Sequence, residues 1–477
     1  MERHRFRALL LVAATFLVAE NSAQAQQTER PLWASNWEDA ELRAGLETYT
    51  AFYAMRGTWW NLTATSAPTF DKNRSFTELW VHPRLDGRMN IGGGTEAYGG
   101  VSVGATSTFG ADAFDYADGR AVRMGSAMLG FRGDLGSLRY DVSGGRQPFT
   151  LGTGMLLAMG SANGFSWGGG ASAQRRVWGR TLLTRVRSGE VTGGTFLLEP
   201  DEAAESRTDT RVQGAFAEWE RPQIGKVGLS WFTAPRSNQI YPGSLAPLRF
   251  IEKGREGLDT LHGWADVVGL VPGVPALGFR AEFAQQRNDI TRASGQRDPM
   301  RAEAWLVGAS WWGQKLPFAP RFSYHLARFS GDKPGTATYE RFDPMFWGNG
   351  LTNWWFGANG AYAWLNSNIR ARRFTLDAYF SPQDIIQFQF VQISADEVNS
   401  PVQFGQGARF TSNGLLVGVP VAKLSDEVYL QYARVINPRL VVSAFVSRSL
   451  PGAGLKAIAP QGTQPWTTAG LGLTANF

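Results

Sequence analysis

The sequence predicts an all-β protein, a transmembrane antiparallel β-barrel of about 18 strands with short periplasmic turns and long extracellular loops. Two-faced segments of roughly ten residues recur along the chain, and the connections between them are alternately short and long. The final segment alternates apolar with small or polar residues and ends on Phe477, which predicts a closing strand. Because a bilayer offers the backbone no hydrogen bonds, strands can cross it only as a closed sheet.

The composition agrees with this fold class. The 477 residues include 56 Gly, 30 Phe, 18 Trp and 12 Tyr, yet the mean hydropathy is −0.22. A net charge of +6 is too small a basic excess to predict a nucleic-acid partner. The chain has no cysteine, as suits an exported protein without structural disulfides. No linker-like change in composition occurs, so we expect residues 26–477 to form a single barrel domain.

Residues 1–25 resemble a secretory signal peptide. Three arginines precede a short apolar run at 8–19, and an A-x-A cleavage site follows at 23–25. The apolar run is too short to span a membrane as a helix. We therefore expect export through the general secretion pathway and a multi-pass barrel in the cell outer membrane.

The clearest hairpin covers residues 127–143. Leu129 and Phe131 alternate with polar or small residues, 133–137 supply turn chemistry, and 138–143 alternate again. Further predicted strands are 43–50, 76–84, 95–105, 211–220, 226–232, 277–286, 302–312, 321–329, 372–380, 385–393, 426–435, 440–448 and 469–477, with weaker ones near Arg175, Thr195, Leu258 and Trp466. Predicted turns are 86–87, 222–225, 272–275, 316–320, 381–384 and 436–439. We place 353–364 and 410–419 in long loops. A soluble β-sandwich or propeller would have shorter strands and no systematic apolar face.

The alternation assigns one face of each strand to lipid and the other to the lumen. The expected lipid-facing residues are Leu129, Phe131, Leu138, Tyr140, Phe279, Phe283, Phe374, Leu376, Phe388, Val428 and Leu430. The expected basic residues of the lumen are Arg43, Arg84, Arg132, Arg139, Arg185, Arg187, Lys226, Arg280, Arg321 and Arg373. The acidic ones are Glu47, Glu78, Glu96, Asp141, Glu218, Glu282, Asp377 and Glu427. Many of these charges can pair across strands, so we expect mild anion preference.

The residues chosen as the solute path are Arg84, Arg132, Arg139, Arg280, Arg321 and Arg373, with Arg146 as a conditional member. Strict alternation from Leu138 would place Arg146 on the lipid side. A bulge at Gly144–Gly145 would turn it inward, so both orientations stay open. Two glycine-rich, aromatic connections, 148–174 and 331–368, are candidate gates. The second connection contains four tryptophans that either line a glycan path or pack over the mouth of the barrel. They are Trp347, Trp354, Trp355 and Trp364.

Catalysis has little support in the sequence. The three histidines beyond the signal segment, His82, His262 and His325, lie in no recognisable nucleophile or metal motif. We therefore expect no catalytic residue, no cofactor and no metal. A barrel enzyme such as an outer-membrane lipase or protease is kept as an alternative.

Several short motifs resemble the alginate-export family of outer-membrane barrels. A strand ends in Gly145-Arg146-Gln147, and further matches lie at 342–346, 366–368, 426–432 and 449–452. The resemblance implies a monomeric 18-stranded porin that carries an anionic exopolysaccharide outward. The expected partners are outer-membrane lipid and lipopolysaccharide, anionic polysaccharide or small anions, and periplasmic export components. A general diffusion porin for small solutes is the nearest alternative.

Overall fold

The structure is a computed structural model that describes residues 31–59, 71–112, 118–158, 168–169, 177–202, 207–243, 250–291, 295, 297–348, 357–402, 408–411, 414–458 and 464–477. The predicted signal segment 1–25 lies outside these residues, as do Trp354, Trp355 and most of the glycine-rich stretch 159–174.

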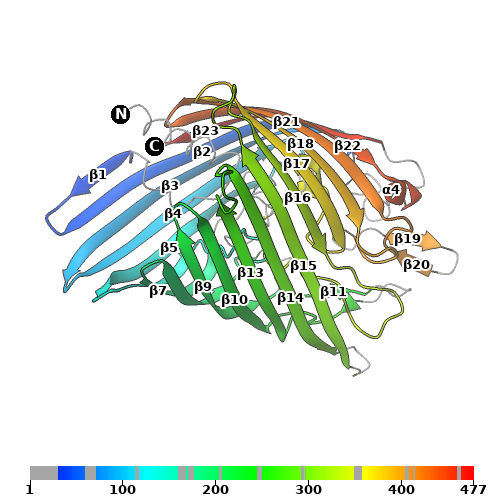
Figure 1. The fold of residues 1–477 in the computed structure, drawn as a ribbon, viewed down its shortest axis with the longest axis horizontal. Coiled ribbons are helices and arrows are strands. Elements are labelled where there is room, and N and C mark those ends of the chain that lie inside the picture. The colour runs from blue at the N-terminus through cyan, green and yellow to red at the C-terminus, as the bar shows by residue number, and fades with distance from the viewer. Residues whose placement is uncertain are drawn as a thin grey trace.

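Eighteen antiparallel strands form one closed barrel, which confirms the predicted fold class (Figure 1). Each strand pairs with the next along the chain, and the last pairs with the first. The barrel strands are β2 (Ala40–Arg56), β3 (Arg74–Gly92), β4 (Thr95–Phe109), β5 (Arg120–Leu135), β6 (Leu138–Gln147), β7 (Trp178–Ser188), β8 (Val191–Glu199), β9 (Arg211–Arg221), β10 (Gly225–Arg236), β13 (Leu258–Val268), β14 (Leu277–Thr291), β15 (Arg297–Trp312), β16 (Arg321–Phe329), β17 (Ile369–Tyr379), β18 (Asp384–Ala395), β21 (Lys423–Asn437), β22 (Leu440–Pro451) and β23 (Trp466–Asn476).

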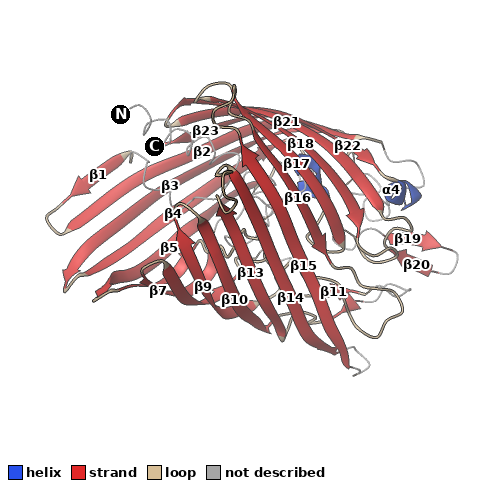
Figure 2. Ribbon diagram, viewed as in Figure 1, coloured by secondary structure: helices blue, strands red, loops and turns tan. Residues whose placement is uncertain are grey.

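A short strand, two short hairpins and two short helices lie outside the set of barrel strands in the described part of the chain. The strand β1 (Trp33–Asn36) pairs with the start of β2, and two short hairpins stand apart from the main sheet. These hairpins are β11 (Tyr241–Pro242) with β12 (Phe250–Ile251), and β19 (Ala408–Thr411) with β20 (Gly414–Val417). The helices are α3 (Gly357–Ala363) and α4 (Ala453–Ile458), drawn in blue in Figure 2. Among the described residues, no helix is long and apolar enough to cross a membrane.

One predicted turn is wrong. Asp86 and Gly87 lie within β3, where Asp86 pairs with Arg43 on one side and Gly100 on the other. The chain turns instead at Gly93 and Gly94, whose φ angles are 62° and 74°. The turn falls at Gly93 and Gly94 because positive φ favours glycine. Asp86 and Gly87 stay extended because the strands on both sides supply ladder hydrogen bonds.

The outer face of the barrel is apolar, as the alternation predicted. All the predicted lipid-facing side chains are exposed or half-buried, with Leu129 57% and Leu430 46% exposed. Exposed apolar bands of this extent need a bilayer to cover them. Short turns lie at one end of the barrel and long connections at the other, so the short-turn end is periplasmic.

The buried core lies inside the barrel rather than between layers. Three segments fold into the lumen, 149–158, 341–347 and 357–368, and we call them the inner plug. Their apolar side chains pack against inward-facing residues of the wall, for example Phe149 against Phe196 at a ring separation of 5.0 Å. The plug therefore fills part of the lumen that the strands alone would leave open.

Candidate functional site: the luminal wall and the inner plug

The first two segments of the inner plug are joined by backbone hydrogen bonds. The amide of Ala158 donates to the carbonyl of Phe346 at 2.9 Å, and the amide of Phe346 donates to Leu156 at 2.9 Å. The third segment contacts them through Asn366, whose Nδ2 donates to the carbonyl of Met155 at 3.4 Å. The three segments thus form one connected unit across the lumen.

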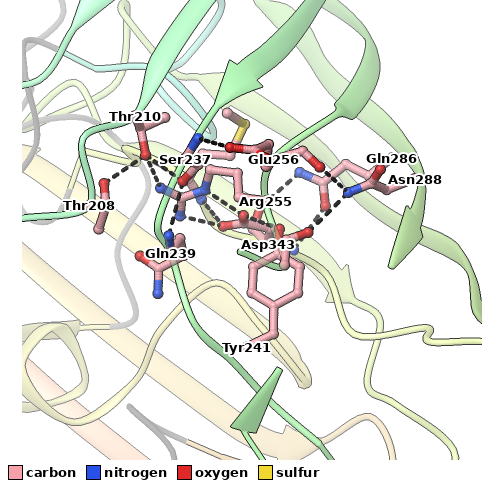
Figure 3. Close-up of polar contacts among 12 residues, drawn as sticks. Thr208, Thr210, Ser237, Gln239, Tyr241, Arg255, Glu256, Gln286, Asn288 and Asp343 are labelled. Atoms are coloured by element: carbon pink, nitrogen blue, oxygen red, sulfur yellow. Dashed lines mark hydrogen bonds and ion pairs between the residues drawn. The ribbon is translucent and has the colours of Figure 1, made fainter. Parts of the chain in front are cut away.

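Asp343 anchors this unit to the wall near the extracellular end (Figure 3). Arg255 holds the carboxylate with two parallel bonds, Nε to Oδ2 at 2.7 Å and Nη2 to Oδ1 at 2.8 Å. The hydroxyl of Tyr241 donates to Oδ2 at 2.5 Å. Gln286 on β14 bonds both backbone groups of Asp343, at 2.8 and 2.9 Å. Asp343 lies in the motif 342–346, so this motif fixes the plug.

The ion pair of Arg255 and Asp343 is almost fully buried, with side chains 5% and 2% exposed. Burial by itself raises the pKa of the Asp343 carboxyl, but the guanidinium of Arg255 and the Tyr241 hydroxyl outweigh it, so the pKa lies below the usual range. The carboxylate is therefore charged at any physiological pH. Breaking such a pair on one side leaves an uncompensated buried charge.

Glu282 on β14 forms a second anchor. One carboxylate oxygen contacts Nε2 of His262 at 2.7 Å, and the other accepts a hydrogen bond from the hydroxyl of Thr153 in the plug. Nδ1 of His262 lies 3.3 Å from the Ser230 hydroxyl, which gives a Ser-His-Glu sequence of contacts. All three wall residues are at most 2% exposed. Through Glu282 and Thr153 this buried arrangement connects the plug to β14.

Glu427 on β21 is the third anchor, and it holds α3. Its carboxylate accepts the backbone amides of Asn359 at 3.0 Å and Gly360 at 2.9 Å. The hydroxyls of Ser447 and Ser449, on β22, donate to the same carboxylate. A wall carboxylate thus satisfies amides at the start of α3 that have no partner within the helix.

Three of the predicted path residues gather on the inner face of β14, β16 and β17: Arg280, Arg321 and Arg373. Arg373 lies directly opposite His325 in the ladder, and all three guanidinium groups act electrostatically on this imidazole. Nε of Arg280 donates to Oδ2 of Asp266 at 3.0 Å. This part of the wall therefore brings three guanidinium groups together, and Arg280 has Asp266 as its carboxylate partner.

The other three predicted path residues lie on β3, β5 and β6, and each has a carboxylate partner. Nε of Arg132 donates to Glu96 at 2.7 Å. Nε of Arg84 lies 3.7 Å from Asp86, and Nε of Arg139 lies 3.3 Å from Asp134. Arg132 and Arg139 lie close to the short turn between β5 and β6. Their charges are largely balanced locally.

The structure places Arg146 on the outer face, so the conditional assignment to the lumen is wrong. A bulge does occur here, but the extra residue is in β7: Gly145 and Gln147 pair with Thr181 and Trp178. Gln147 consequently keeps its inward direction and bonds Thr181 at 2.7 Å. Arg146 points the other way and bonds Asp201 at 2.5 Å.

Four basic side chains of the inner face have no ion pair with a carboxylate among the described residues. They are Arg185, Arg187, Lys226 and Arg321. Arg321 pairs with Asp377 in the ladder without reaching ion-pair distance, and the guanidinium of Arg185 lies 5.9 Å from the ring centre of Phe149 in the plug. Sequence alternation predicts that these residues face the lumen. It does not predict which arginines form ion pairs with carboxylates on neighbouring strands.

The two described tryptophans of the long connection are packed into the plug region. Trp347 is 7% exposed and Trp364 1% exposed. Both therefore favour the packing interpretation over a glycan path.

Comparison with solved structures finds the same barrel in bacterial porins. The chain resembles OccK5 (OpdH) of Pseudomonas aeruginosa, with a TM-score of 0.52 and 9% identity over 92% of this chain and 98% of that chain. OpdL of the same organism gives 0.51 at 9%, covering 91% and 98%. A BenF-like porin from Pseudomonas fluorescens Pf-5 gives 0.51 at 13%, covering 93% and 100%. No protein-family model and no curated protein matches the sequence. At these identities the likeness concerns the fold, and the chain has the fold of outer-membrane porins.

Proposed function

We propose that this protein is an outer-membrane channel for anionic solutes that carry carboxylate groups. The observation that supports it is the set of inner-face basic side chains that form no ion pair with a carboxylate in the described part of the chain: Arg185, Arg187, Lys226 and Arg321. The guanidinium group stays charged at physiological pH and matches a carboxylate with its planar fork. Charges of one sign in a narrow, partly filled lumen raise the local concentration of the opposite ion.

The finer proposal concerns the solute. The resemblance to the alginate-export family supports an alginate-like uronate polymer as the solute. On the same basis we propose that residues 1–25 are removed during export through the general secretion pathway. The remaining chain then acts as a monomeric single-domain barrel, with periplasmic export components as partners.

Reversal potentials in planar bilayers under a salt gradient test the channel proposal. We expect mild anion preference in the native protein, and a shift toward cations when the four unpaired luminal residues are replaced by glutamine. A control with the same change in net charge replaces outer-face residues: Arg56, Arg120, Arg236 and Arg448. The control should keep the native selectivity, because those charges face away from the lumen. Native cation preference, or equal shifts in both variants, would contradict the proposal.

Block of the ion current distinguishes the solute classes. Monomeric uronate and uronate oligomers are added on the periplasmic side at equal carboxylate concentration. An export channel for the polymer predicts stronger block by oligomers, since several carboxylates contact the wall at once. Equal block favours a diffusion porin for small anions.

A further inference from the structure

The outer face carries a second group of arginines at the extracellular end of β14 to β17. We call it the outer basic belt: Arg287, Arg301, Arg328, Arg370 and Arg372. These side chains alternate with buried residues and share the outer face with lipid-facing positions. On the same strands, aromatic side chains lie one or two outward-facing positions closer to the membrane centre than the arginines. They are Trp305, Tyr324 and Phe374. The belt therefore lies where the aromatic band meets the headgroups of the outer leaflet.

Like charges face one another within the belt. Arg287 lies directly opposite Arg301 in the ladder, and Arg328 lies directly opposite Arg370. Such pairs repel unless an anion lies between them. Asp396 serves one pair, because Nε of Arg328 and Nε of Arg370 donate to it at 2.7 and 2.6 Å.

The second pair has no such carboxylate. Arg287 donates to the neutral side chain of Gln285 at 3.0 Å, and Asp259, opposite in the ladder, does not reach ion-pair distance. Arg301 and Arg372 likewise have no ion pair with the residues that the structure describes. The exposed guanidinium groups of Arg287 and Arg301, on the adjacent strands β14 and β15, and of Arg372, on β17, thus have no counter-ion among the residues that the structure describes.

The periplasmic end of the outer face is different. Its described strand positions carry two arginines, Arg221 and Arg434, and each has its own carboxylate. Arg221 lies 2.9 Å from Glu190, and Arg434 lies 3.1 Å from Asp384. Excess positive charge on the outer face is therefore concentrated at the extracellular end.

We propose that the outer basic belt binds the phosphate groups of a phosphorylated lipid in the outer leaflet, with the facing pair Arg287 and Arg301 as phosphate ligands. An arginine fork binds a phosphate through two parallel charge-assisted hydrogen bonds. A phosphate between Arg287 and Arg301 removes their repulsion, while the acyl chains of the same lipid cover Trp305 and Tyr324 below. The belt faces away from the lumen, so this binding is independent of solute selectivity.

The test is native mass spectrometry of the purified barrel in neutral detergent with bisphosphorylated lipid A as the probe. Each arginine near an anionic headgroup contributes about 1 kcal/mol, so R287Q/R301Q should bind the probe roughly thirtyfold more weakly. The matched control, R221Q/R434Q, loses the same charge at the periplasmic end and should bind like the native protein. Unchanged binding by R287Q/R301Q, or equal losses in both variants, would overturn the proposal.

A second comparison tests the same proposal with the native protein alone. The native barrel is compared with bisphosphorylated and fully dephosphorylated lipid A, which share the same acyl chains. Phosphate recognition predicts a large loss with the dephosphorylated lipid, whereas equal affinity would show that the acyl chains alone hold it and would refute the belt as a phosphate site. The single variant Arg301→Gln, at an exposed position, keeps the residue-level test available if the double variant fails to fold.

Discussion

The carboxylate of Glu427, on the barrel wall, accepts the backbone amide of Asn359 in α3 at 3.0 Å. This long-range contact attaches α3 to β21, in addition to the hydrogen bonds that the Asn359 side chain makes with Ser449 and Thr468. Replacing Glu427 with alanine removes every acceptor for the amides of Asn359 and Gly360. We expect noisier single-channel current and higher mean conductance, because α3 then samples several positions. Ser443→Ala, on the same inner face of β22, is the control and should leave the current quiet. A quiet current in Glu427→Ala would show that other contacts suffice to hold α3.

The ion pair of Asp343 and Arg255 predicts a specific dependence on pH. The pKa of Asp343 is lowered in the folded protein, so its contribution to stability is complete above the unfolded value of about 3.9 and disappears as the pH falls through the lower, folded value. The plug should therefore remain anchored at pH 5 to 8 and loosen only in strong acid. Asp343→Asn should loosen it at neutral pH, at a cost of roughly 3–5 kcal/mol in anchoring. Conductance recorded as a function of pH measures both effects, and a native transition between pH 5 and 7 would contradict this assignment.

The outer face of β5 predicts a depth-dependent cost of inserting charge. Leu129→Arg, near the middle of the strand, should lower the free energy of unfolding by about 2–4 kcal/mol. The same change at Val122, on the same face near the extracellular end, should cost about 0–1 kcal/mol. Urea titration in lipid vesicles, read by tryptophan fluorescence, compares the two. Equal costs would mean that the membrane does not lie where the strand alternation places it.

Gly152 predicts how closely the plug approaches the wall. A Cβ at this position would lie 2.6 Å from Oε1 of Glu282, and φ is 59°. Gly152→Ala should therefore displace the plug from Glu282 and His262, by both contact and backbone strain. Gly335→Ala, also at positive φ but in open space, carries only the strain. Protease digestion from the extracellular side should cut the plug faster in Gly152→Ala than in Gly335→Ala, and equal rates would show that contact with Glu282 is unimportant.

Sequence alternation was sufficient for the barrel and its lipid face, because the period of two is a local property that every strand displays. It was insufficient at Asp86, where glycine-rich turn chemistry occurs both inside β3 and at its end. At Arg146 strict alternation was right, and the bulge expected to turn this residue inward belongs instead to the neighbouring strand. The bulge becomes visible only from the ladder, in which Gly145 pairs with Thr181 and Gln147 with Trp178.

The inner plug and the charge balance of the lumen depend on residues far apart in the chain. Asp343 meets Arg255, and Thr153 meets Glu282, across connections whose paths no local pattern specifies. For the same reason the sequence favoured Arg84 and Arg132, which are neutralised, over Arg185 and Lys226, which are not. The pairing of an inner-face arginine is decided by neighbours on adjacent strands.

The seam between β2 and β23 joins the two ends of the described chain, with Glu47 opposite Asn476 and the amide of Phe477 bonded to the carbonyl of Leu46 at 2.8 Å. Until this seam forms, both strands expose a full edge of unpaired backbone groups, which a bilayer cannot satisfy. Closing it requires every intervening hairpin to have the correct stagger. Closure of this barrel therefore depends on the register of every strand pair. One hairpin with a shifted register would leave the last strand without a partner.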